Sequence, residues 1–99
     1  MRNYYSDYVG HMMRQYLKLK ESPAEELSET TTINIDICET ALKRLPDIER
    51  RLLESVYSSG KNLKEGIAVT VEETGLRERT LWAIVKNFEK EVADERGLT

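Results

Sequence analysis

A row of basic side chains recurs near the C-terminus of the chain: Arg77, Arg79, Lys86 and Lys90. At about 100 degrees per residue in a helix, Arg79, Lys86 and Lys90 fall on one face together with Ala83. Trp82 and Asn87 lie at the edges of that face, and no carboxylate falls on it. Guanidinium and ammonium groups arranged in this way bind phosphates and the edges of bases. The pattern therefore indicates a surface for nucleic acid.

The helix that would position this row is indicated by its opposite face. Large apolar residues recur there at spacings of three and four, which makes one buried stripe: Leu81, Ile84, Val85, Phe88 and Val92. Glu78, Glu89 and Glu91 project towards the flanks of the stripe. The spacing predicts a helix from Glu78 to about Arg96, ended by Gly97.

A second helix is predicted immediately before it. Asn62, followed three residues later by Glu65, suits a helix start, and Gly75 suits a left-handed stop. Thr70 with Glu73 offers a competing start for this helix. Two helices joined by a short glycine turn, with a basic outer face on the second, are typical of a DNA-binding helix-turn-helix. The predicted DNA-contacting residues are Arg77, Arg79, Thr80, Trp82, Ala83, Lys86, Asn87 and Lys90. For Trp82 alone, packing at the edge of the core is favoured over a contact with DNA.

The first half of the chain reads as three further helical segments. Residues 3–20 show an apolar stripe, widened by Met13 and Leu17: Tyr5, Tyr8, Val9, Met12, Tyr16 and Leu19. We interpret these tyrosines as contacts in the core or with a partner helix, rather than as side chains that stack on nucleic-acid bases, and His11 as solvated. Ser22-Pro23 predicts a short helix to about Ser28.

Residues 30–37 are ambiguous, because they alternate as in a strand but also share helical faces. We favour a helix over 32–44, and a ribbon pairing them with residues 67–71 is the alternative. Leu45-Pro46 then opens another helix, in which Leu45, Ile48, Leu52 and Val56 form the buried stripe. The fold class is thus all-α, a small domain of four to five helices with a C-terminal helix-turn-helix and a long recognition helix.

Composition narrows the class of protein. With 99 residues, the chain suits a single domain over 1–99, with a leading helix and acidic connector at 1–29 and the helix-turn-helix core at 30–99. Its net charge of −3 is unevenly spread, since residues 21–39 contain six acids and no base. No apolar run suits a membrane span or a signal peptide, which predicts a cytoplasmic protein. One cysteine and one histidine offer no metal cluster, and we expect neither a catalytic site nor a cofactor.

Residues 45–98 resemble the fourth conserved region of bacterial sigma factors and the small phage or prophage regulators related to it. The resemblance rests on Leu45-Pro46 with Glu49-Arg50 in the first helix, and on Thr74-Gly75-Leu76 before the recognition helix. It implies a sequence-specific transcriptional regulator that reads the major groove of double-stranded DNA. The alternatives are a module that binds RNA polymerase or another regulator, and a small DNA-packaging subunit. The wide stripe at the N-terminus further predicts a homodimer.

Overall fold

The computed structural model describes residues 5–23 and 26–98, and it is built of five α-helices. These are α1 (Ser6–Glu21), α2 (Glu29–Lys43), α3 (Asp47–Ser58), α4 (Leu63–Thr74) and α5 (Glu78–Arg96). The described ranges contain no strand, which confirms the predicted all-α class. None of these helices is both long and apolar enough to span a membrane within the described residues.

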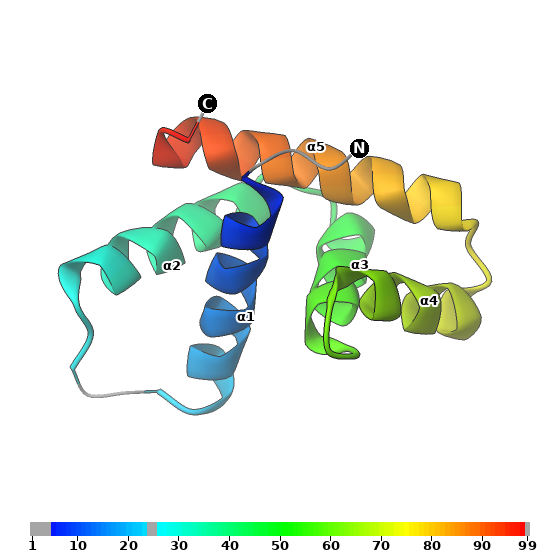
Figure 1. Cartoon of the computed structure of the whole chain (residues 1–99), viewed down its shortest axis with the longest axis horizontal. Helices are drawn as coiled ribbons and strands as arrows, with labels where there is room; N and C mark the ends of the chain where they lie inside the picture. Colours follow the sequence, from blue (N-terminus) through cyan, green and yellow to red (C-terminus); the bar gives the residue numbers. More distant parts are fainter. Residues whose placement is uncertain (1–4, 24–25, 99) are drawn as a thin grey trace.

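The long helix α5 lies along one side of the molecule, and the other four helices lie beneath it in the view of Figure 1. All four pack against α5. The core draws fully buried side chains from every helix, among them Met12, Leu42, Leu53, Ile67 and Phe88. Helix α1 packs on α2, α3 and α5, so the N-terminal segment shares one core with the rest.

The ends of the last two helices follow local sequence signals. Asn62 is the N-cap of α4, and its side chain accepts a hydrogen bond from the Glu65 backbone N–H at 2.9 Å. Gly75 and Gly97 close α4 and α5 at φ of 73° and 83°, a region that favours glycine. The predicted start at Asn62 is therefore confirmed. The competing start at Thr70 is not used, because Thr70 lies buried in mid-helix.

The ambiguous segment at residues 30–37 is helical, as favoured. Helix α2 begins after Ser28, whose Oγ accepts a hydrogen bond from the Thr31 backbone N–H at 3.1 Å. The position of this cap also explains why one predicted helix was wrong. The short helix predicted from Ser22 to Ser28 is absent from residues 22, 23 and 26–28, and its last residue starts α2 instead. Positions 24 and 25 of that prediction lie outside the described residues.

Two predicted buried faces need correction. Met13, expected at the margin of the first stripe, is completely buried, and Leu19 is only partly buried. Ile48, expected in the stripe of the helix at Pro46, is 68% exposed. Burial in α3 begins one turn later, at Leu52 and Leu53. Pro46 is the N-cap of α3 rather than part of its first turn.

Candidate nucleic-acid interface

The outer face of α5 is open to solvent. Of the eight predicted contact residues, seven are exposed: Arg77, Arg79, Thr80, Ala83, Lys86, Asn87 and Lys90. Trp82 is half-buried and packs against the core, as the sequence favoured. The opposite face supplies Leu81, Val85, Phe88 and Val92 to the core, each at most 1% exposed. The predicted division of this helix into an apolar and a basic face is therefore correct.

The basic side chains of this face have no acidic partner among the described residues. Arg77, Arg79, Lys86 and Lys90 form no ion pair with any of the residues that the structure describes. Three bases elsewhere, Lys43, Arg44 and Arg50, do form ion pairs: Lys43 Nζ lies 3.0 Å from Glu39 Oε1, for example. From Arg79 to Lys90 the face extends for about 17 Å at 1.5 Å per residue. A row of exposed, unpaired cations of this length can neutralise phosphates of a duplex.

The beginning of α5 adds donors from the backbone. Arg77 is the N-cap, and its side chain makes no capping hydrogen bond. The first N–H groups of a helix have no partner within it, and the helix dipole makes this end positive. Leu76 N–H, in the turn before it, donates to Thr74 Oγ1 at 3.2 Å, which fixes the path of the chain into the helix. This end of α5 can therefore donate to a phosphate beside Arg77 and Arg79.

Glu78 lies closer to this surface than the sequence indicated. It was placed towards the flank of the apolar stripe, but it is exposed, and its Oε1 accepts a hydrogen bond from Trp82 Nε1 at 3.2 Å. Residues four apart on a helix lie one turn above one another, which explains the contact. A carboxylate thus stands at the edge of the basic face, next to Arg77 and Arg79 in sequence.

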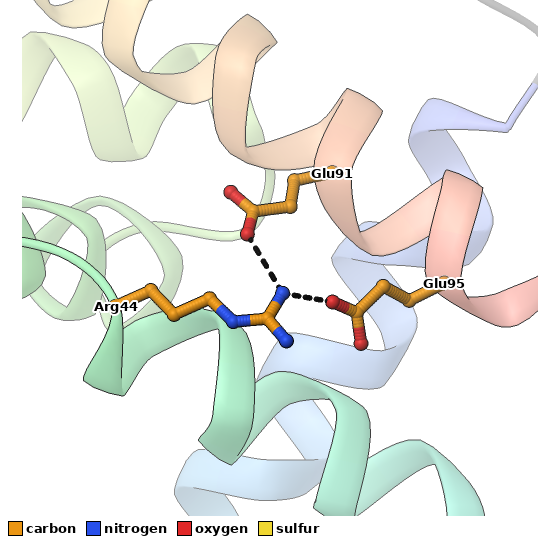
Figure 2. Close-up of polar contacts among 3 residues, drawn as sticks. All are labelled: Arg44, Glu91 and Glu95. Atoms are coloured by element: carbon orange, nitrogen blue, oxygen red, sulfur yellow. Dashed lines mark hydrogen bonds and ion pairs between the residues drawn. The ribbon is translucent and has the colours of Figure 1, made fainter.

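The other two acids predicted at the flanks of the stripe, Glu89 and Glu91, contact neighbouring elements. Glu89 is buried and accepts a hydrogen bond from the Ser6 hydroxyl on α1. Glu91 Oε1 lies 3.2 Å from Arg44 Nη1, and the same guanidinium nitrogen contacts Glu95, as Figure 2 shows. These carboxylates are therefore engaged by α1 and by the end of α2, away from the outer face.

Further polar contacts anchor the C-terminal half of α5. Arg96 Nε donates to Asn34 Oδ1 at 2.8 Å, and Asn34 Nδ2 donates to the Tyr8 hydroxyl at 3.4 Å. Asn34 is only 3% exposed, and a buried amide needs such partners. The sequence analysis did not identify Asn34 or Arg44, because their partners lie 62 and 47 or more residues away. Together they fasten α5 to α2 as a fixed platform for its outer face.

Helix α4 is fixed on α3 by close contact. A Cβ added at Gly66 would lie 1.8 Å from the carbonyl oxygen of Val56, so only glycine permits the observed approach. Four residues further along, the Thr70 hydroxyl lies 2.9 Å from the Ser55 hydroxyl. Since α4 leads directly into α5 through Gly75, this packing also sets where α5 begins.

Comparison of the chain with protein-family models, with curated proteins and with solved structures gave no match. Within residues 5–23 and 26–98, no three histidine, cysteine or carboxylate side chains are grouped to hold a metal ion. The lone cysteine, Cys38, is buried, and this burial raises the pKa of its thiol to about 12. The thiol is therefore protonated at neutral pH, unlike a reactive cysteine.

Proposed function

We propose that this protein is a sequence-specific regulator of transcription that binds double-stranded DNA with the outer face of α5. In this proposal α4, Gly75 and α5 act as a helix-turn-helix, and α5 lies in the major groove. The observation that carries it is the unpaired, exposed row Arg79, Lys86 and Lys90, on a helix whose other face is built into the core. The resemblance of residues 45–98 to the fourth region of sigma factors agrees with this arrangement.

The roles of the side chains differ along the helix. Arg79 lies in the first turn of α5, next to the open backbone N–H groups, and its guanidinium can bind the two acceptors of a guanine. Lys90 lies three turns later, and we assign it to a phosphate. Thr80, Ala83 and Asn87 have the size and polarity to line the groove between them. Trp82 supports the edge of the surface through its packing and its bond to Glu78.

The proposal is tested with a duplex selected from random sequences by the wild-type protein. Arg79→Ala, Lys86→Ala and Lys90→Ala should each weaken binding and leave the melting temperature unchanged, because all three side chains are exposed. Loss of a phosphate contact at Lys90 should weaken all sequences alike and lower the salt slope by about 1. Loss of a base contact at Arg79 should cost about 1 to 3 kcal/mol at one base position and relax specificity there.

Lys18→Ala is the matched control. Lys18 is an exposed lysine in the last turn of α1, and its removal changes the net charge equally. In Figure 1 this end of α1 lies away from α5. The affinity of the Lys18→Ala variant for DNA should equal that of the wild type at moderate salt. Equal affinities and salt slopes for all four variants would contradict DNA binding by α5. A protein-binding module that contacts RNA polymerase or another regulator would then be the better proposal.

A homodimer on a two-fold operator remains a prediction, but its original basis has changed. Much of the apolar stripe of α1 is buried within its own chain, where Val9 and Met12 have no exposed surface, while Tyr16 and Leu19 are partly buried. Two exposed isoleucines, Ile33 and Ile48, are left to support an interface. Sedimentation in the presence and absence of the selected duplex measures the state directly. Two protomers on each duplex would support the prediction, and one would contradict it.

A further inference from the structure

A cleft of about 740 Å³ opens between α1, α2 and α3. Part of its wall is apolar, formed by Tyr16 and Leu19 on α1 and by Ile35 and Leu42 on α2. Leu42 is 2% exposed and belongs to the core, so the cleft reaches the core. At the rim, Leu27 leaves 42% of its surface exposed. Pockets of 300 to 1,000 Å³ with mainly apolar walls are typical of small-molecule sites.

The charged groups that line the cleft are mostly basic. Lys20, Lys43, Arg50 and Arg51 stand against two carboxylates, Glu39 and Glu54. Lys43 is paired with Glu39 at 3.0 Å, and Arg50 with Asp47 at 2.9 Å. This leaves Lys20 and Arg51, both exposed and in no ion pair with the described residues, against the single carboxylate of Glu54. The unpaired charge of the cleft is therefore positive.

Tyr16 adds a polar group to the apolar wall. The Lys20 ammonium lies 5.9 Å from the centre of the Tyr16 ring, which places this cation over the aromatic wall. Burial, and then the negative charges of Glu39 and Glu54, raise the pKa of the Tyr16 hydroxyl. The hydroxyl thus stays protonated at neutral pH and can donate a hydrogen bond. An apolar cavity with one donor and two free cations fits a molecule with an apolar body and an anionic end.

We infer that this cleft is a binding site for a small amphipathic carboxylate, held by Leu19, Ile35 and Leu42 around its apolar body and by Arg51 and Lys20 at its carboxylate. Arg51 is the head-group ligand because it is the free guanidinium of α3, and a guanidinium binds carboxylates in a bidentate manner. The inference is independent of the proposed DNA function, since none of these residues belongs to the outer face of α5.

The test uses three probes that share one alkyl chain: octanoate, octan-1-ol and octylammonium. Calorimetric titration of the full chain should give saturable binding of one octanoate, with an affinity at least about tenfold higher than for the other two probes. The affinity for octanoate should fall as salt is added, while that for octan-1-ol should not. Amide NMR shifts on octanoate addition should centre on Tyr16, Leu19 and Ile35.

Arg51→Gln is the decisive variant, because Arg51 is exposed and its replacement leaves the core intact. It should weaken octanoate binding about fivefold and leave octan-1-ol binding unchanged. Lys86→Gln, the same change of charge on α5, should alter neither. Equal binding of all three probes, absence of saturable octanoate binding, or shifts centred on another part of the molecule would each overturn the inference.

Discussion

Glu78 is the residue whose substitution we expect to strengthen DNA binding. Its carboxylate is exposed at the start of α5 and accepts the Trp82 indole N–H. If the adjoining basic face lies against phosphates, this negative charge opposes binding. Glu78→Gln keeps an acceptor for the indole while removing the charge. We expect it to tighten duplex binding about two- to fivefold at low salt, measured by fluorescence anisotropy.

Asp36→Asn serves as the control for Glu78→Gln. Asp36 is exposed on α2, so it gives the same change of net charge away from the proposed surface. If both variants tightened binding equally, the effect would be one of overall charge. If Glu78→Gln had no effect, the start of α5 would lie away from the DNA.

At the scale of the elements, the junction of α3 and α4 depends on Gly66. An alanine Cβ there would lie 1.8 Å from the Val56 carbonyl oxygen, which belongs to helix backbone and has little freedom to move. We expect Gly66→Ala to lower the free energy of unfolding by about 3 kcal/mol or more, the upper range for overpacking. Urea denaturation measures this loss.

Gly10→Ala provides a contrast within the same fold. Gly10 lies inside α1, and its added Cβ would meet the flexible end of Arg14, at 3.0 Å from Nη1, and Tyr57 Cε1 at 4.0 Å, an ordinary contact distance. Since alanine favours a helix by about 1 kcal/mol over glycine, the variant should change stability by no more than that amount. A Gly66 variant as stable as the Gly10 variant would mean that α3 and α4 approach less closely.

The stripe of α5 makes a separate prediction. Phe88 is 1% exposed, and its ring centre lies 6.3 Å from that of Tyr57 on α3. Phe88→Ala should therefore cost about 3 to 5 kcal/mol of stability. An unchanged melting temperature would place the apolar face of α5 outside the core and would invert the assignment of its two faces.

Sequence patterns were sufficient where structure is decided by nearby residues. The Asn62 cap, the Gly75 stop and the stripe of α5 each depend on residues within a few positions, and all three were predicted correctly. Ile48 shares the helical spacing of Leu52 and Val56 but is 68% exposed, so spacing alone did not separate it from the buried residues of α3. Likewise, the prediction of a short helix starting at Ser22 was wrong. The residue types of a cap do not show whether a serine ends the helix before it or starts the helix after it.

The candidate DNA surface could be predicted from the sequence and the cleft could not, for the same reason. The outer face of α5 belongs to one helix, so its periodicity identified the exposed bases Arg79, Lys86 and Lys90, although not the exposed Glu78 at its edge. The cleft joins residues from Tyr16 to Glu54 on three helices, and no spacing along the chain predicts that Arg51 and Lys20 line the same cleft. Only the packing of α1, α2 and α3 places them there.

At the scale of the whole molecule, the buried thiol of Cys38 lets us predict how the free energy of unfolding changes with pH. Burial raises the pKa of Cys38 from about 9.0 to about 12, so the folded chain keeps its proton where the unfolded chain loses it. The contribution of Cys38 to stability is complete below pH 9 and is lost as the pH rises towards 12. Between pH 8 and pH 10 this single group should lower the free energy of unfolding by about 1.4 kcal/mol. Tyr16, whose pKa is also raised, acts in the same direction at higher pH.

Cys38→Ala isolates this contribution, because the variant retains every other titrating group. Urea denaturation of both proteins at pH 8, 9 and 10 should show the difference in stability between them shrink by about 1.4 kcal/mol over the range. The wild-type thiol should also resist iodoacetamide under native conditions at pH 8 and react once the chain is unfolded. Parallel pH profiles together with fast alkylation of the folded protein would mean that Cys38 is accessible, and that α2 packs less tightly on the core than the structure shows.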